Sequence, residues 1–264
     1  MAGRRAPDVE TPRPAPDAWL QSLLSLSWLE LPWLLPAPSP PSAAAPGRRH
    51  NGATHRFLYF SGSDLWPQWA FAHGGVLWSS RGLDSEGFVL KLLASGGVYR
   101  YRSGALNDLE VIGRQYSLAA LPGWRFKRGA VDLVVFAGLD LHHFRLLPND
   151  PQSRLNGRHV GLRAGFELWY EPSVGTMLAA DGSASSIGAG EYARVAYGWR
   201  LFDRFYIGPE AQIYRTDPYV HARFGAHITA FRFADREWSA ALGYASDNDR
   251  RSGTYLRLSV LARR

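Results

Sequence analysis

From about residue 56 onward, hydrophobic and polar side chains alternate along the chain. In the segment 159–171, apolar or small side chains from Val160 to Tyr170 occupy every second position. The positions between them carry polar side chains such as Arg163 and Glu167. Strict alternation over this length predicts a β-strand with one apolar and one polar face.

The same two-residue period recurs in segments 131–142, 192–201, 205–214, 219–231 and 255–262. In 219–231 the pattern assigns Phe231 to the same face as His221 and His227. Several segments reach the roughly 9–11 residues that a tilted strand needs to cross a bilayer. We expect about twelve strands, within limits of 10–14, near 56–64, 68–78, 86–101, 108–121, 131–144, 157–171, 176–186, 191–201, 205–215, 219–232, 237–245 and 254–262.

The connections between these strands are sorted by length. Those near 171–175, 201–204 and 234–236 are short, whereas those near 146–156 and 246–253 are longer and polar. Membrane barrels have short turns on the periplasmic side and longer loops outside. The sorting therefore favours an antiparallel up-and-down barrel over a soluble sandwich.

Alternation alone leaves open which face turns outward, and a soluble β-domain remains the alternative. Three features favour an apolar face turned toward lipid. The polar faces contain many glycines and charges of both signs, as a crowded lumen requires. Aromatic residues near the ends of the apolar faces, such as Tyr170, Trp199, Phe205, Trp238 and Tyr244, are typical of interfacial girdles. We predict an all-β transmembrane barrel in a bacterial outer membrane.

Residues 1–52 differ from the remainder, so we divide the chain into this leader and a barrel domain over 53–264. Arg4, Arg5 and Arg13 precede an apolar run over 19–35, and small residues follow at 42–45. This order imitates a signal peptide. Acidic residues within the segment leave two alternatives, a disordered leader or a start codon assigned too far upstream. No stretch of 18 apolar residues is present to form a transmembrane helix.

Composition narrows the possible partners and chemistry. The chain has no Cys, which excludes thiol catalysis, disulfides and Cys-based zinc sites. Its net charge of +7 favours contact with an acidic surface such as lipopolysaccharide, together with outer-membrane lipid. Because the basic residues are scattered, we expect no nucleic acid partner.

We also expect no cofactor, metal site or catalytic residue. His142 and His143 are adjacent in a strand, so their side chains point to opposite faces. The sequence contains no phosphate-binding glycine loop with a following helix. An enzymatic alternative would use His221 or His227 with Ser259 or Glu210 across the lumen, as in barrels that modify lipid A.

The polar faces combine aromatic side chains with Arg and Glu, which is a chemistry suited to sugar chains. The alternative is a plug of packed side chains, since a barrel of this size need not hold a pore. The candidate lumen-facing residues are Tyr99, Tyr101, Arg163, Glu167, Trp169, Tyr192, Arg194, Arg200, Tyr206, Glu210, Tyr214, His221, Arg223, His227, Tyr255 and Arg257. Tyr219 belongs to the same aromatic set.

A series of short motifs runs in order through the chain. They include Phe60-Ser61-Gly62-Ser63-Asp64-Leu65-Trp66, His73-Gly74-Gly75-Val76-Leu77-Trp78, Leu121-Pro122-Gly123-Trp124-Arg125-Phe126-Lys127, Ala164-Gly165-Phe166-Glu167-Leu168-Trp169-Tyr170-Glu171-Pro172 and Tyr206-Ile207-Gly208-Pro209-Glu210. Over about 57–264 the chain resembles the cellulose biosynthesis protein BcsS family of alphaproteobacteria. The resemblance implies an outer-membrane barrel encoded with cellulose-synthesis genes, without an established activity.

Three functions follow as hypotheses. The first is a non-enzymatic barrel that assists the secretion or surface organisation of cellulose, with the glucan chain or other cellulose-synthesis proteins as partners. The second is a barrel enzyme that modifies lipid A or glycan. The third is a scaffold that docks periplasmic cellulose-synthesis proteins.

Overall fold

The computed structural model describes residues 55–216 and 219–264. The predicted signal or leader over 1–52 lies outside these residues. Within the described part the chain forms twelve strands and one short 3₁₀ helix, η1. The strands are β1 Phe57–Trp66, β2 Trp69–Ser79, β3 Gly87–Ser103, β4 Leu109–Arg128, β5 Val131–Leu147, β6 Gly157–Ser173, β7 Thr176–Ser185, β8 Gly190–Leu201, β9 Phe205–Thr216, β10 Tyr219–Phe233, β11 Arg236–Asp247 and β12 Ser252–Arg263, with η1 at Gly104–Leu106.

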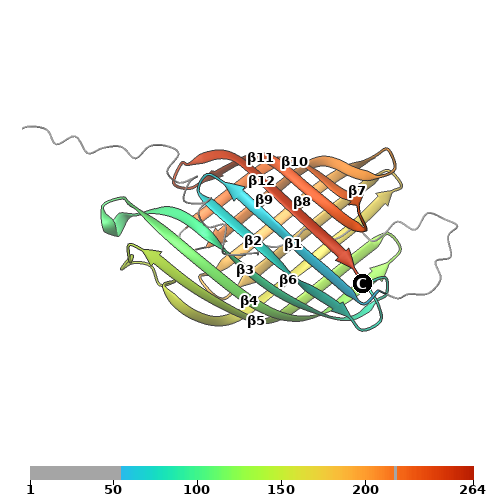
Figure 1. Ribbon diagram of the computed structural model, residues 1–264, viewed down its shortest axis with the longest axis horizontal. Helices are drawn as coiled ribbons and strands as arrows, with labels where there is room; N and C mark the ends of the chain where they lie inside the picture. The colour runs from blue at the N-terminus through green and yellow to red at the C-terminus, as the bar shows by residue number, and fades with distance from the viewer. Residues whose placement is uncertain (1–54, 217–218) are drawn as a thin grey trace, which may run out of the picture. The chain divides into compact units, whose positions relative to one another are not determined.

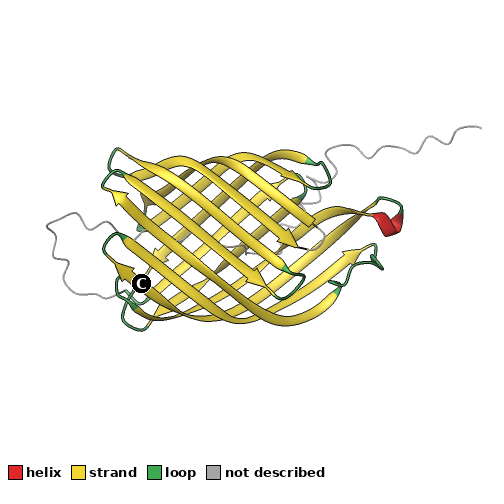
Figure 2. Cartoon of the chain, turned by 180° about the vertical axis from the view of Figure 1, so that it is seen from behind, coloured by secondary structure: helices red, strands yellow, loops and turns green. Residues whose placement is uncertain are grey.

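The strands form one closed barrel in which each pairs antiparallel with its neighbours in sequence (Figures 1 and 2). β1 and β12 close the ring, with Leu58 opposite Arg263 and Leu65 opposite Leu256. Closure leaves no sheet edge, so ladder hydrogen bonds continue around the ring. The predicted up-and-down barrel of about twelve strands is confirmed.

The outer face of the barrel carries an apolar band. On β6, Val160 is 75% exposed and Leu162 is also exposed, whereas Trp169 is buried inside. On β5 the outward residues from Val131 to Leu141 cover about 25 Å of height at the usual strand rise and tilt. A closed barrel with an exposed apolar band of this height is suited to a bilayer. No helix in the described segments is long and apolar enough to cross a membrane.

The two ends of the barrel differ. We call the end where β1 begins and β12 ends the closed end; there Arg264 N donates to Phe57 O at 2.8 Å. The opposite end, which carries the connections 104–108, 148–156 and 248–251, is the mouth end. Every connection named as short in the sequence lies at the closed end, and both longer ones lie at the mouth end.

One connection at the closed end departs from this sorting. The segment 80–86 between β2 and β3 has seven residues, yet it joins strands at the end with short turns. Its Leu83 is buried in the barrel, and Arg125 of β4 donates a hydrogen bond to the Leu83 carbonyl. This connection is long because it folds inward and fills the lumen.

A β-bulge corrects the predicted face of Phe231. The register between β10 and β11 shifts between Ile228 and Phe231, and Ala230 takes a left-handed φ of 63°. Thr229 before the bulge is 2% exposed, whereas Phe231 after it is 43% exposed. Assigning Phe231 to the lumen face was wrong, because one extra residue reverses the alternation.

Candidate functional site

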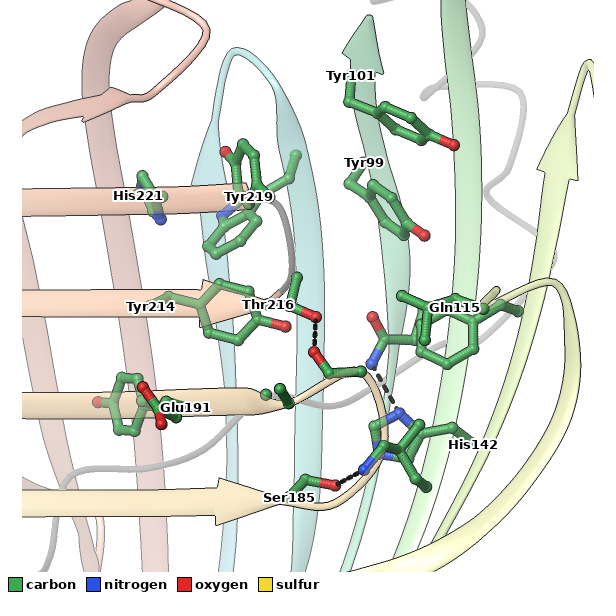
Figure 3. A pocket seen from close by; sticks show the side chains of 18 of the residues that line it. Tyr99, Tyr101, Gln115, His142, Ser185, Glu191, Tyr214, Thr216, Tyr219 and His221 are labelled. Atoms are coloured by element: carbon green, nitrogen blue, oxygen red, sulfur yellow. Dashed lines mark hydrogen bonds between the residues drawn. The ribbon is translucent and has the colours of Figure 1, made fainter. Parts of the chain in front are cut away.

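A cavity of about 910 Å³ occupies the lumen at the mouth end (Figure 3). Its lining comes from inward-facing residues of the strands together with the connections 148–156 and 186–189. A volume of this size is typical of small-molecule and cofactor sites. The cavity is therefore the candidate functional site.

Aromatic side chains form the walls of the cavity. Phe71, Tyr99 and Tyr101 make a ladder along β2 and β3, in which Phe71 stacks on Tyr99 at 6.4 Å and Tyr99 on Tyr101 at 6.1 Å between centroids. Tyr214 and Tyr219 project from β9 and β10 on another side of the lumen (Figure 3). These rings offer flat apolar faces, and the tyrosines among them add polar hydroxyls at the ring edges.

A polar cluster on β5, β6 and β7 forms another part of the wall. Asp140 accepts hydrogen bonds from Arg163 Nε at 3.1 Å and from Ser185 Oγ at 2.6 Å. His142 Nε2 lies 3.1 Å from the second Asp140 oxygen, and Gln115 Nε2 lies 3.4 Å from His142 Nδ1. The Asp140 charge is thereby compensated, while side chains of the cluster still line the cavity.

Ion pairs form the floor of the mouth cavity. Arg223 Nη1 donates to both carboxylate oxygens of Asp64 at 2.6 and 2.5 Å, which links β10 to β1 across the lumen. The Arg223 guanidinium also lies over the rings of Trp69 and Tyr255, at 4.7 and 5.0 Å from their centroids. Beside it, Arg257 Nη2 donates to Glu210 Oε2 at 2.5 Å.

Buried side chains fill the lumen beneath this floor. Glu210 also accepts from Arg194 at 3.2 Å and from Tyr255 at 3.0 Å. Lys91 forms an ion pair with Glu167 and lies 5.2 and 5.1 Å from the ring centroids of Phe60 and Phe136.

Nearer the closed end, two apolar clusters complete the packing: one centred on Phe60, Leu77, Leu83, Val89, Leu121, Val134 and Phe136, the other on Trp169, Met177, Ala179, Ala196 and Tyr206. The sequence left open whether the lumen is a pore or is plugged by side chains. In the described residues, a cavity at the mouth end lies above a packed plug.

The structure divides the sixteen residues predicted to face the lumen into three levels. Eight line the mouth cavity: Tyr99, Tyr101, Arg163, Tyr192, Tyr214, His221, Arg223 and Arg257. Five belong to or lie beside the packed layer beneath it: Glu167, Arg194, Glu210, His227 and Tyr255. The remaining three, Trp169, Arg200 and Tyr206, form a separate cluster toward the closed end. There Arg200 donates a hydrogen bond to the Tyr206 hydroxyl, and Tyr206 packs edge-on against Trp169.

The sequence did not identify several residues that shape the cavity. Trp69 and Phe71 lie on β2, where the alternation is weak because Ala, Gly and His interrupt it. Asp140 and Ser185 face inward on strands that were predicted, so their positions on the polar face were an available signal. Asp150 lies in a connection, to which the alternation rule does not apply.

Asp150 fixes the connection 148–156 at the rim. Tyr101 Oη donates to Asp150 Oδ2 at 2.8 Å, and the Gln152 backbone N–H donates to Oδ1 at 3.0 Å. Burial alone would raise the pKa of Asp150, but these hydrogen bonds hold it below its ordinary value. The carboxylate form thus holds the loop beside the aromatic ladder.

The two histidines of the enzymatic alternative have structural partners. His221 stacks on Trp66 at 4.9 Å and accepts from Arg223 Nε at 3.0 Å. His227 Nε2 donates to Tyr197 O at 3.1 Å. Within the described residues, neither is hydrogen-bonded to Ser259 or Glu210, and no cluster of metal ligands is found. As expected, His142 is buried while its neighbour His143 is exposed.

Several solved structures are similar to the chain at low sequence identity. The COG4313 outer membrane channel from Pseudomonas putida F1 is 10% identical, with a TM-score of 0.47, covering 83% of this chain and 99% of the other. A KdgM porin in complex with disordered oligogalacturonate is 10% identical with a TM-score of 0.45, covering 78% and 98%. The translocator domain of autotransporter NalP from Neisseria meningitidis is 13% identical with a TM-score of 0.43, covering 82% and 90%. At this level the likeness says nothing about what this chain binds.

The comparison of sequences is more specific. No curated protein matches the chain. The family model described as cellulose biosynthesis protein BcsS matches residues 58–264, which include the whole barrel except its first residue. The family and the lipid-facing barrel together place the protein in the bacterial outer membrane and connect it with cellulose biosynthesis. The chain belongs to the cellulose biosynthesis protein BcsS family.

Proposed function

We propose that this barrel is a non-enzymatic accessory protein that assists the secretion or surface organisation of cellulose. It does so by holding a segment of the glucan chain in the mouth cavity. The observation that carries this proposal is the aromatic-walled cavity of about 910 Å³ above a packed lumen. The family connects the barrel with cellulose, and the cavity supplies a surface on which a sugar chain can bind.

The chemistry of the walls suits a neutral sugar chain. Glucose rings present apolar C–H faces that stack on aromatic rings, and the ladder of Phe71, Tyr99 and Tyr101 offers successive rings for this purpose. Hydroxyl groups of the sugar require donors and acceptors, which Gln115 and Ser183 provide in the lining. The main floor charges are paired with each other, which favours an uncharged ligand over a strongly acidic one.

The packed layer below the floor favours capture over conduction. A glucan passing through the barrel would have to displace the buried Lys91–Glu167 pair and both apolar clusters. Breaking a buried ion pair typically costs several kcal/mol. The proposed role is therefore to retain or orient a chain at the cell surface, with secretion through another component.

Deletion of the gene in its own host tests this role. We expect cellulase-releasable glucose at the cell surface to fall, while cellulose synthase activity in isolated inner membranes persists. The wild-type gene should restore surface cellulose, and a gene carrying Trp69→Ala and Tyr99→Ala should not. Unchanged surface cellulose on deletion, or full restoration by the double variant, would contradict the proposal.

A further inference from the structure

Three arginines meet on the outer face of the barrel near the mouth end. Arg114 of β4 lies directly opposite Arg145 of β5 in the strand register. Arg158 of β6 lies opposite His143, two residues before Arg145 on β5. All three arginines are exposed, and on β5 the neighbours Phe144 and Leu146 turn inward. The arginine row, as we call Arg114, Arg145 and Arg158, thus projects away from the lumen.

The arginine row has no acidic partner on the protein. Among residues 55–216 and 219–264, none of the three has a carboxylate within ion-pair distance, whereas the exposed Arg215 has Glu191 at 3.9 Å and Arg100 has Glu110 at 3.3 Å. Like charges directly opposite each other in a sheet are destabilising. Diagonal cross-strand neighbours are also within reach of long side chains, so Arg158 joins the same field of positive charge. An anion bound between these side chains would remove the repulsion.

The row lies immediately above the apolar band. On β4, β5 and β6 the outward residues Leu118, Leu141 and Val160 form one cross-strand row, and all are exposed. The next outward row toward the mouth contains Tyr116, His143 and Arg158, and the row after it contains Arg114 and Arg145. Aromatic and basic side chains at this level are at the height of lipid headgroups.

We propose that the arginine row is a binding site for the phosphate groups of lipid A in the outer leaflet. Guanidinium groups bind phosphate through paired N–H donors, which makes Arg the side chain best suited to such a ligand. The acyl chains of the same lipid would cover Leu118, Leu141 and Val160 below. A soluble polyanion would have no use for this adjoining apolar surface, which is why we assign the site to a phosphorylated glycolipid. The site is on the opposite face of the barrel wall from the glucan cavity and does not depend on it.

Binding of purified lipid A to the full chain in detergent, followed by native mass spectrometry, tests the site. The test variant is Arg114→Gln, Arg145→Gln and Arg158→Gln together. The matched control replaces Arg81, Arg204 and Arg236, three exposed arginines in or next to connections at the closed end, with Gln. Both variants should fold. Folding is checked by electrophoresis, in which the unheated, folded barrel migrates faster than the heated, unfolded chain.

We expect the test variant to bind bisphosphorylated lipid A about ten-fold or more weakly than the wild type, and the control to bind it as the wild type does. Lipid A stripped of its phosphates should bind the wild type no better than it binds the test variant. Equal weakening in both variants would reduce the effect to net charge and overturn the proposal. Tighter arginine-dependent binding of phosphatidylglycerol than of lipid A would also overturn it, as would full competition by inorganic phosphate at equal concentration.

Discussion

The indole of Trp69 packs edge-on against the phenol ring of Tyr214, with 5.7 Å between their centroids. Trp69 belongs to β2 and Tyr214 to β9, strands that are not neighbours in the ring, so the contact crosses the lumen. Trp69 also contacts His221 and carries the Arg223 guanidinium over its face. This crossing joins the aromatic walls of the mouth cavity to the ion-paired floor beneath it.

Replacing Lys91 with Met should destabilise the barrel. The substitution leaves the Glu167 carboxylate buried without its partner, which typically costs about 3–5 kcal/mol. Adding Glu167→Gln should recover much of this loss, because no uncompensated charge remains. Urea-induced unfolding monitored by tryptophan fluorescence measures both effects. The control is Arg215→Gln, which breaks an exposed pair and should cost less than about 1 kcal/mol; a similar cost for Lys91→Met would contradict the buried plug.

Glycine at position 208 should be indispensable for closure of the barrel wall. A Cβ added there would lie 2.0 Å from the Tyr197 carbonyl oxygen on the paired strand β8. We expect Gly208→Ala to reduce the folded fraction sharply in heat-modifiable electrophoresis. The matched change Gly175→Ala has no atom within 4 Å of the new Cβ and should fold normally. Normal folding of the Gly208 variant would show that the two strands are not so closely apposed.

The sequence predicted the barrel well because its main signal, alternation, is a direct consequence of a wall with lipid on one side. From Val131 onward this signal identified the strands and most inward residues. It failed at Phe231, where a bulge at Ala230 reversed the faces, and it ended the fourth strand near residue 121 although β4 continues past Pro122 to Arg128. A bulge shifts the phase of the two-residue period, and a proline removes one ladder hydrogen bond, so neither the bulge position nor the true end of β4 could be read from the alternation alone.

The floor of the site was beyond what the sequence could show. Alternation indicates which residues face the lumen but not which of them meet across it. The Asp64–Arg223 pair joins residues 159 positions apart, and its formation depends on the curvature of the closed ring. The separation of cavity residues from plug residues depends on the same curvature.

Removal of the Asp150 carboxylate should free the connection 148–156. Hydrogen bonds lower the pKa of Asp150 in the folded protein. The stability that its carboxylate gives to the connection is therefore fully present above the ordinary carboxyl pKa of about 3.9, and it is lost as the pH falls from there through the lowered pKa. Asp150→Asn should therefore accelerate tryptic cleavage after Arg154 at neutral pH several-fold. Tyr101→Phe, which removes one donor, should have a smaller effect. Identical cleavage rates in all three proteins would mean that Asp150 does not hold the loop.

The packed lumen also predicts the electrical behaviour of the protein. Since Lys91, Glu167 and the apolar clusters fill the barrel below the cavity, insertion of the purified protein into planar bilayers should produce no long-lived conductance steps. Current recordings at low and moderate voltage measure this. Frequent, stable open states in the wild type would contradict a plugged barrel and would favour a conduit.

Binding of cellohexaose to the purified full-length barrel tests the central claim most directly. Isothermal titration should detect binding to the wild type, and Trp69→Ala should weaken it about ten-fold, consistent with about 1–1.5 kcal/mol for one lost aromatic contact. The matched variant Trp199→Ala removes an indole from the exposed lipid-facing side and should bind as the wild type does. Absence of binding to the wild type, or equal affinity of the Trp69 and Trp199 variants, would contradict a glucan site in the mouth cavity.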